Sequence, residues 1–549
     1  MSCPGAGDAK ISEGWDYIIV GAGSAGCVLA ERLSADGRSR VLLLEAGGKN
    51  DSFWVRLPKG VAKLVTNPAH IWAYQVAEPR VPGEAANEVW IRGKGLGGSS
   101  AVNGMIWSRG EPADYDAWEE AGATGWNGAN MTAAFLELED HAAGASTMRG
   151  SGGPVHVDPV AHSFLLAETM IAAGEAIGLK RVDDLNGTIG DRVGLYSHNI
   201  RRGERQSSAH TFLARAEGRA NLTVVTDARA ERVLLDGYRA VAVEARVGGE
   251  LKRFECKGEI IVSGGAIESP LLLQRSGIGD GEKLKAAGIE PLVHSPAVGE
   301  HLIEHLCISL PYRLARGNGV QASFSGLGLY AAMMRWFLTR RGIMGTGPFE
   351  VGAFMNVAHR DGRTDAQIYL GGYMFAVGED NNPVPLDQID KRPGITIYAA
   401  LLRPSSEGSL HAGGPASGDA PDIRPNWLAT EEDRRAAVAL VRAMRRYVAA
   451  PPLGDLVGQE VLPGAKVESD EDILAAFRKL STSGLHAVGT CRMGTGNESV
   501  VDPRLKVNGV EGLRIADCSV MPLPVTGNTN APAMAVGLRA AALILADRA

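Results

Sequence analysis

The sequence lacks the features that mark several classes of protein. It has no run of about 18 uncharged apolar residues, so we expect no transmembrane segment. Residues 1–14 contain no apolar stretch of the signal-peptide type, and we expect a flexible tail there. Only six cysteines occur in 549 residues, without a C-x-x-C pair. We therefore predict reduced thiols, no metal site and a cytoplasmic location.

Clusters of positive charge are also scarce. Lys and Arg number 56 against 63 Asp and Glu, which gives a formal net charge of −7. Without a Lys/Arg block we predict no nucleic-acid partner, and we interpret the basic group Arg201, Arg202 and Arg205 as a solvated turn. The chain is 45% hydrophobic and too long for one compact domain, so we expect two or more folded units.

Glycine, in contrast, is abundant, with 70 residues gathered in short clusters. The first cluster is the G-x-G-x-x-G sequence of residues 21–26, which follows the apolar run 17–20. Apolar residues at helical spacing come next, and a second apolar run, 41–44, ends at Glu45. This order of strand, glycine turn, helix, strand and acid is typical of a dinucleotide-binding unit.

Each position of this motif has a physical role. Gly21 permits the tight turn, Gly23 lets the backbone approach a pyrophosphate, and Gly26 lets the helix pack on the strand. The helix N-terminus attracts phosphates, and Glu45 can accept hydrogen bonds from a ribose. The predicted contacts also include Ser24, Ala25 and Ala46. The alternative is a glycine turn used only for packing, and the motif alone does not choose between NAD and FAD.

A second glycine-rich loop spans residues 93–107. Five Gly and two Ser within a dozen residues favour neither helix nor strand, and they let the backbone approach a flat or anionic group. We expect Asn103 at the start of a following helix. The alternative is a structural turn. The predicted cofactor contacts in this loop are Gly95, Gly98, Ser99, Asn103, Gly104, Met105 and Ile106.

Residues 93–116 resemble the first signature of the glucose–methanol–choline (GMC) oxidoreductases, and residues 265–279 resemble the second. The resemblance extends from Asp16 to about Ala546. It implies an α/β, Rossmann-like FAD-binding domain and an α+β substrate domain with an antiparallel sheet. The implied division is 15–155, 221–300 and 485–549 for FAD, and 156–220 and 301–484 for substrate.

The resemblance also implies roles for single residues. Some members attach FAD through a His where this chain has Val102, so we predict non-covalent FAD. Residues 221–247 alternate as antiparallel strands do, and Val233 is implied to lie near the adenine. His301 and His305 stand in a segment where we expect structural hydrogen bonding and not catalysis.

The catalytic residues are implied near the C-terminus. His486, within a run of small residues, aligns with the active-site His of the family, and Asn528 with the second catalytic position. Asp517 and Cys518 are implied to contact the ribityl and phosphate groups, and Asn530 the flavin ring. The apolar tail 534–546, interrupted by Arg539, is predicted to be a buried terminal helix.

These residues predict the oxidation of an alcohol to an aldehyde. A neutral His486 can accept the hydroxyl proton, Asn528 can hydrogen-bond the oxygen, and the hydride goes to flavin N5. We favour a dehydrogenase whose electron acceptor is a quinone or a protein, and an oxidase that uses oxygen is the alternative. A hydroxynitrile lyase and a non-catalytic flavoprotein remain alternatives from other classes. An oligomer is possible.

The substrate is predicted from residues 313–400. A helix is expected at 330–340, followed by a loop rich in Gly and Pro that covers the cavity. The aromatic residues Phe349, Phe354, Tyr373 and Phe375 favour an apolar or aromatic primary alcohol. Glu350 is expected either to face the cavity, where a cationic alcohol such as choline would fit, or to be a buried structural carboxylate.

Overall fold

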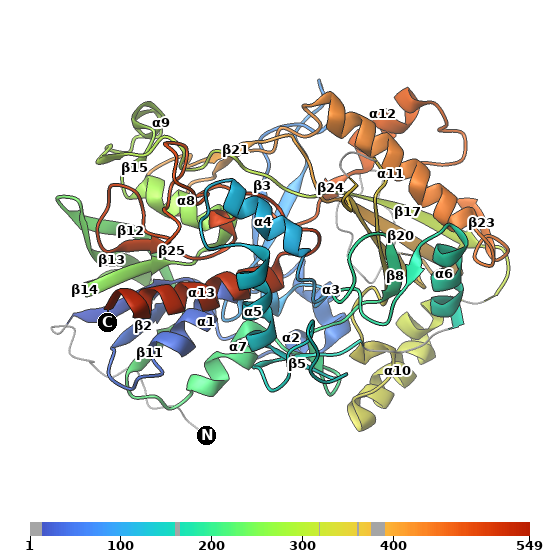
Figure 1. Ribbon diagram of the computed structural model, residues 1–549, viewed down its shortest axis with the longest axis horizontal. Coiled ribbons are helices and arrows are strands. Elements are labelled where there is room, and N and C mark those ends of the chain that lie inside the picture. Colours follow the sequence, from blue (N-terminus) through green and yellow to red (C-terminus); the bar gives the residue numbers. More distant parts are fainter. Residues whose placement is uncertain (1–13, 160–164, 318, 359–361, 375–389, 549) are drawn as a thin grey trace.

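The fold is built on two sheets that lie side by side along the long axis of the molecule (Figure 1). The computed structural model describes residues 14–159, 165–317, 319–358, 362–374 and 390–548. Two predictions lie outside the described residues: the tail, of which only Gly14 is described, and the role of Phe375. An α/β unit and a unit with an antiparallel sheet are both present, as the resemblance implied.

The first sheet is parallel at its centre. Its order is β11-β2-β1-β14-β13-β12, with β25 beside β14. The strands are β1 (Trp15–Val20), β2 (Val41–Leu44), β11 (Leu222–Val225), β12 (Ala228–Asp236), β13 (Arg239–Val247), β14 (Glu250–Val262) and β25 (Leu513–Ile515). The short apolar runs of the sequence form the central strands, which are buried on both faces.

Strand β14 belongs to two kinds of sheet at once. Its second half pairs in parallel with β1 and β25, and its first half pairs antiparallel with β13. The expectation of antiparallel strands over residues 221–247 is confirmed for β12 and β13. It is wrong for β11, which pairs in parallel with β2 because the chain reaches that sheet edge after a long excursion.

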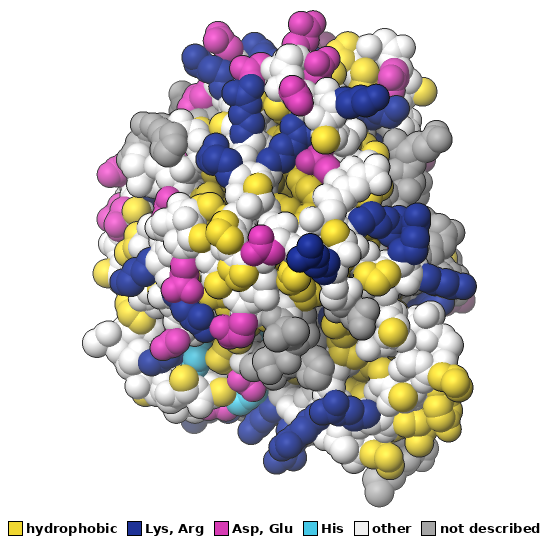
Figure 2. All heavy atoms as spheres, turned by 90° about the vertical axis from the view of Figure 1, so that its right-hand side faces the viewer, with side chains coloured by type: hydrophobic (Ala, Val, Ile, Leu, Met, Phe, Trp, Pro, Cys, Tyr) yellow, Lys and Arg dark blue, Asp and Glu magenta, His cyan; other side chains and the backbone are white. Residues whose placement is uncertain are grey.

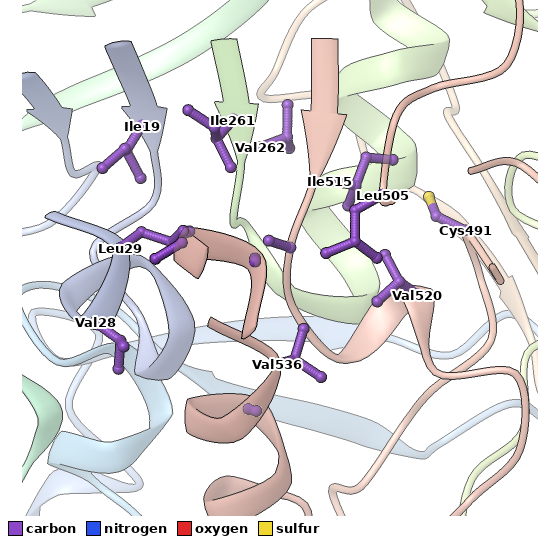
Figure 3. Close-up of a cluster of buried hydrophobic side chains, with 14 of the residues drawn as sticks. Ile19, Val28, Leu29, Ile261, Val262, Cys491, Leu505, Ile515, Val520 and Val536 are labelled. Carbon is purple, nitrogen blue, oxygen red and sulfur yellow. The ribbon is translucent and has the colours of Figure 1, made fainter. Parts of the chain in front are cut away.

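A large apolar core lies between this sheet and its helices (Figure 3). Ile19, Ile261 and Ile515 stand on neighbouring parallel strands and face Leu29 of α1 (Ser24–Leu33) and Val536 of α13 (Asn530–Arg548). The terminal helix is therefore buried, as predicted.

The second sheet is antiparallel over most of its width. Its order is β23-β17-β20-β19-β18-β8-β7, with β24 beside β17. The strands are β7 (Lys180–Arg181), β8 (Arg192–Leu195), β17 (Leu306–Leu314), β18 (Val351–Met355), β19 (Ala366–Gly371), β20 (Gly394–Leu401), β23 (Val457–Glu460) and β24 (Thr482–Ser483). Helices α6 (Leu165–Ala176), α11 (Glu431–Ala449) and α12 (Asp470–Leu480) close a second core on one face.

Shorter elements complete the described chain. They are α2 (Phe53–Arg56), α3 (Val61–Leu64), β3 (Ile71–Gln75), β4 (Val89–Gly93), α4 (Pro112–Glu120), α5 (Gly128–Leu138), β5 (Glu139–His141), β6 (Val155–Val157), β9 (Ile200–Arg201), β10 (Glu204–Arg205), α7 (Ser208–Thr211), α8 (Gly265–Arg275), β15 (Ile278–Gly279), α9 (Gly281–Ala286), β16 (Val293–His294), α10 (Gly326–Thr339), β21 (Ser409–His411) and β22 (Asp422–Arg424). The 3₁₀ turns that concern the site are η1 (Pro58–Gly60), η2 (Gly98–Ala101) and η5 (Ile343–Gly345).

The helix expected at 330–340 is α10, which begins earlier, at Gly326. The two cores are compatible with the predicted FAD and substrate segments, whose residue boundaries stay a prediction. Within the described ranges, no helix has the length and apolar character that crossing a bilayer requires.

Candidate active site

A cavity of about 610 Å³ is lined by residues of both sheets. One wall comes from the carboxyl ends of the parallel strands, represented by Val20, Leu44 and Ser263. Ligands of open α/β sheets bind at this edge. Another wall comes from β17, β19 and β20 of the second sheet. The cavity therefore joins the predicted cofactor segments to the predicted catalytic segments.

The first glycine turn has the geometry that its sequence predicts. Gly21 has a φ of +103°, which side-chain-bearing residues rarely adopt. A methyl group at Gly26 would lie 1.9 Å from the carbonyl oxygen of Gly21, so only glycine allows α1 to pack this closely. Gly21, Gly23, Ser24 and Ala25 line the cavity, whereas Gly26 acts behind it through packing.

Glu45 joins the two glycine-rich loops. Its carboxylate accepts hydrogen bonds from the backbone amides of Ala22 (2.8 Å), Gly47 (2.9 Å) and Gly95 (2.9 Å). Burial raises the pKa of Glu45, and these amides oppose that shift. Glu45 and Ala46 line the cavity, whereas Gly95 does not and donates its amide to Glu45.

The second loop surrounds the cavity but starts no helix. Gly98, Ser99, Asn103, Gly104, Met105 and Ile106 all line the cavity, as does Val102. The expected helix start at Asn103 is wrong: its side-chain oxygen accepts the amide of Met105 (3.0 Å), whose φ is +62°. A left-handed residue is incompatible with a helix, so the asparagine stabilises a turn.

A buried arginine supports this loop from behind. Arg205 donates to the carbonyl of Val55 (3.0 Å) and to the backbone and side-chain oxygens of Asn103 (2.7 and 2.9 Å). Burial lowers its pKa to about 9. The interpretation of Arg205 as part of a solvated turn is therefore wrong, because the β9–β10 hairpin turns this side chain inward while Arg201 and Arg202 stay exposed.

Val233, which the resemblance implied to lie near the adenine, is not among the residues that line the cavity. The amide of Val233 donates to Ser276 Oγ (2.8 Å), and its side chain is buried in the core. Ala228, Arg229 and Ala230, earlier on β12, line the cavity instead.

The C-terminal segments bring further polar groups to the cavity. Asp517 accepts hydrogen bonds from Ser269 Oγ (2.6 Å) and the amide of Gly265 (2.9 Å), and both Asp517 and Cys518 line the cavity. The oxygen of Asn530 accepts Ser24 Oγ (2.8 Å). Its Nδ2 is buried without a partner among the described residues, so it has a hydrogen bond to offer to a bound group.

His486 lies where this wall meets the second sheet. Its Nε2 is 3.0 Å from Nδ2 of Asn528, and both residues line the cavity. The amide of His486 donates to Glu304 (2.7 Å), and the preceding Leu485 has a φ of +63°. Burial, with His305 and Arg92 nearby, holds the pKa of His486 well below 6.5.

The orientation of the Asn528 amide is fixed by its neighbours. Its Oδ1 accepts Gln367 Nε2 (3.1 Å), and its Nδ2 points to Tyr369 Oη (3.2 Å) as well as to His486. Tyr369 in turn donates to Gln367 Oε1 (2.7 Å). Because Nδ2 can only donate, His486 Nε2 must be the acceptor, and the proton of the neutral ring is on Nδ1.

His305 contacts His486 directly, which the sequence interpretation missed. The two Nδ1 atoms are 3.0 Å apart, and the rings are nearly perpendicular at 81°. His301, grouped with His305 in the sequence, instead bonds Glu407 (2.6 Å) away from the cavity. Pairing of β17 with β24 brings residues 305 and 486 together, and no local pattern predicts that pairing.

The second sheet divides its residues between core and cavity by alternation. On β17, Leu306, Ile308 and Leu310 enter the core, and Cys307 and Ser309 line the cavity. The same alternation exposes Tyr369 on β19, and Thr396 and Tyr398 on β20, to the cavity. Among the described residues of β17, β19 and β20, none of those that line the cavity is charged. The alternation of side chains along these strands is the sequence signal that could have identified them.

The Gly- and Pro-rich loop contributes one of its two predicted residues. Phe349 lines the cavity and stacks on Tyr398 at 6.0 Å between ring centres. Glu350 does not line it: the carboxyl is buried, accepts Thr346 Oγ1 (2.7 Å), and has its pKa raised by burial against the opposing charge of Lys59. Of the two alternatives for Glu350, the structure therefore shows the buried structural carboxylate and not a residue that faces the cavity.

Two other predicted aromatic residues, Phe354 and Tyr373, do not line the cavity. In the part of the chain that the structure describes, no group of three or more His, Cys, Asp or Glu is placed to hold a metal ion.

Comparison with known proteins agrees with this arrangement. Residues 15–307 and 404–537 match the family described as GMC oxidoreductase. The chain is 36% identical to an alcohol dehydrogenase [acceptor] of Pseudomonas putida, with 97% of this chain and 96% of that protein covered. It is 34% identical to an oxygen-dependent choline dehydrogenase of Vibrio vulnificus (strain YJ016), with 97% and 94% covered.

Among solved structures, pyridoxine 4-oxidase from Mesorbium loti is similar, with a TM-score of 0.85 and 30% identity. The match covers 96% of this chain and 98% of that one. These similarities extend over both sheets, so they include the cavity and all of its walls.

Proposed function

The chain belongs to the GMC oxidoreductases, FAD-dependent enzymes that act on CH–OH donors, and from this premise we propose that it oxidises a neutral aromatic primary alcohol to the aldehyde. The observation that carries the proposal is the bond between His486 and Asn528. This bond makes Nε2 the unprotonated ring nitrogen of a histidine that lines the cavity and whose pKa is well below 6.5.

His486 Nε2 is proposed to take the hydroxyl proton of the alcohol. The ring is neutral at pH 7, which is the state a general base requires. Asn528 Nδ2, oriented by Gln367 and Tyr369, is placed to donate to the alcohol oxygen as negative charge develops there. When bound, FAD supplies the hydride acceptor at N5.

His305 is proposed to position His486. The Nδ1 proton of His486 can be donated to Nδ1 of His305, which keeps the acceptor nitrogen of His486 directed at the cavity. Burial lowers the pKa of His305 to about 4, so this ring is neutral and able to accept. The pair is thus one neutral unit, and its acceptor nitrogen, Nε2 of His486, is bonded to Asn528 until a substrate hydroxyl takes that place.

The wall of the cavity supports the neutral, aromatic class of alcohol. Phe349, Tyr369 and Tyr398 can pack against an aromatic ring, and Ser309 and Thr396 can hydrogen-bond a polar ring substituent. Glu350, the carboxylate that would attract a cationic alcohol, is buried and is not among the residues that line the cavity. These contacts argue against choline, although several relatives are named for it.

FAD is proposed to bind without a covalent bond. The glycine cradle, the carboxylates Glu45 and Asp517, and the unpartnered Nδ2 of Asn530 fit the group. Val102 offers no nucleophile, and burial raises the pKa of the Cys518 thiol to about 12, which keeps it unreactive. Acid precipitation should release yellow flavin into the supernatant; a yellow pellet would contradict this.

The reaction is tested by mixing the purified holoenzyme anaerobically with benzylic, furanic, aliphatic, polyol and choline substrates. Benzylic or heteroaromatic alcohols should bleach the visible flavin band fastest. Bleaching by choline in preference would overturn the substrate class. A normal flavin spectrum that no alcohol bleaches would overturn the reaction, and cyanide release from a cyanohydrin without bleaching would indicate a lyase.

The electron acceptor is proposed to be a quinone or a protein, as in a dehydrogenase. Oxidase activity is the second candidate, because the similar pyridoxine 4-oxidase is named as an oxidase. Admitting air to the bleached enzyme separates the two. Slow return of the flavin colour supports the dehydrogenase, and immediate return supports the oxidase.

A further inference from the structure

Helix α10 exposes an unusual number of large hydrophobic side chains. Leu327, Tyr330, Met334, Phe337 and Leu338 are exposed, with 88% exposure for Leu327 and 77% for Leu338. Most of these positions recur every three or four residues and therefore share one side of the helix. With Trp54 of α2, which is also exposed, they are called here the apolar face of α10.

The opposite side of the helix is anchored. Trp336 is buried, donates to the carbonyl of Gly203 (2.8 Å) and packs against Leu57, Ile343 and Met344. Phe53, next to Trp54, stacks on Phe337 with 5.4 Å between ring centres. The apolar face is thus held in place by a small core of its own, and it includes the outer surface of both α10 and α2.

The charged residues of α10 and of the sequence on either side of it are all basic, and one of them, Arg340, is paired with Glu204 (3.7 Å). Between Glu304 and Glu350 the sequence contains five arginines and no acidic residue. Arg335 and Arg341 are exposed, at the C-terminal end of α10. Figure 2 shows hydrophobic side chains gathered on the lower part of the face that carries α10 in Figure 1, with Lys or Arg side chains beside them.

We propose that the apolar face of α10 docks the enzyme on an anionic lipid bilayer. A helix that lies in the membrane interface combines exposed Leu and aromatic residues with basic neighbours, and this helix has both. Docking of a second copy on the same face would be isologous, and it would bring the arginines of the two copies together. Charge complementarity therefore favours the lipid surface.

The position of the face relative to the cavity gives this docking a consequence. α10 leads through η5 to Pro348 and Phe349, which line the cavity, and α2 leads through η1 to α3, whose Val61 and Ala62 also line it. An enzyme docked through α10 would hold this part of the cavity wall next to the lipid.

The test is flotation of the FAD-loaded enzyme with vesicles. Binding is expected to phosphatidylcholine–phosphatidylglycerol vesicles, more weakly to phosphatidylcholine alone, and less at high salt. Leu327→Gln/Leu338→Gln should need roughly tenfold more lipid for half-maximal binding. Ile189→Gln/Leu251→Gln, at exposed positions elsewhere, is the matched control and should bind as the wild type does.

The electrostatic part is tested separately. Arg335→Gln/Arg341→Gln should lose most of the preference for the anionic vesicles, whereas Arg38→Gln/Lys479→Gln, also exposed, should keep it. Equal binding by all variants, or no binding to either vesicle, would overturn the proposal. So would a dimer in light scattering that the leucine variant abolishes while no lipid binding is seen. Flavin reduction by a soluble alcohol should be unchanged in these variants, so failure here is distinct from failure of the proposed reaction.

Discussion

The cofactor end and the histidine end of the cavity are built in different ways. At the cofactor end, two short glycine clusters form a large part of the wall, and a turn such as that at Gly21 is encoded within a few residues. At the histidine end, His486, Asn528, His305 and Tyr369 come from four distant segments and meet only in the folded chain. The first end depends on backbone space, and the second on hydrogen-bond geometry.

This difference predicts different failures on mutation. A change at the cofactor end should remove the cofactor or the fold, and a change at the histidine end should leave the yellow holoenzyme and remove its chemistry. The predictions below test that contrast, from the largest expected effect to the smallest.

The largest effect is expected from Gly26→Ala. The added methyl group would lie 1.9 Å from the Gly21 carbonyl oxygen, so backbone has to move, at a cost of about 3 kcal/mol or more. FAD content per chain and the melting temperature should both fall strongly. Gly48→Ala, where no atom lies within 4 Å of the added methyl, is the control. Normal FAD content in Gly26→Ala would refute the packing argument.

His486→Ala should keep FAD and lose the reaction. Removing the proton acceptor should slow anaerobic flavin reduction by about 10²-fold or more, as general-base loss usually does. Stopped-flow reduction by the best alcohol of the panel measures the effect. The control is His301→Asn, because His301 lies away from the cavity. Asparagine tolerates the left-handed backbone of this position, so flavin reduction in this variant should keep its normal rate. An unchanged rate in His486→Ala would reject the role of the base.

His305→Phe should have a smaller effect with its own signature. The phenyl ring fills the site of the imidazole but cannot accept the Nδ1 proton of His486, so reduction should slow by roughly tenfold. Because His305 helps to lower the pKa of His486, the acid limb of the pH–rate profile should move to higher pH. His305→Asn, which retains an acceptor, should restore part of the rate. A slower rate with an unmoved pH profile would indicate a structural role only.

The effect that is smallest near neutral pH, and that grows only in acid, is on stability. The pKa of His305 is lowered to about 4 in the fold, so the unfolded chain binds its proton first as the pH falls below 6.5. Its contribution to stability is complete above pH 6.5 and is lost between 6.5 and about 4, at about 1.4 kcal/mol per pH unit.

Buried carboxyls such as Glu45 and Glu304, whose pKa is raised, act in the opposite direction. The quantity to measure is therefore the difference in unfolding free energy between the wild type and His305→Asn. This difference should turn against the wild type as the pH falls through this range. A difference that does not change with pH would contradict the lowered pKa of His305.

Much of the cofactor end could be predicted from the sequence, and the exceptions are instructive. The roles of Gly21 and Gly26, and the cavity positions of Glu45 and Asn103, depend on short-range backbone geometry. Val233, which the resemblance implied to lie near the adenine, is not among the residues that line the cavity, and its amide donates to Ser276 Oγ.

The sequence by itself determined the glycine turns, the buried central strands and, with the family resemblance, the choice of His486 and Asn528. Only the tertiary structure decided which residues stand beside them. His305 is joined to His486 by β17–β24 pairing, Glu350 turns into the protein, and Arg205 is buried behind a loop. The physical reason is that turns and buried strands depend on neighbours along the chain, whereas a hydrogen-bonded site depends on contacts between strands far apart in sequence.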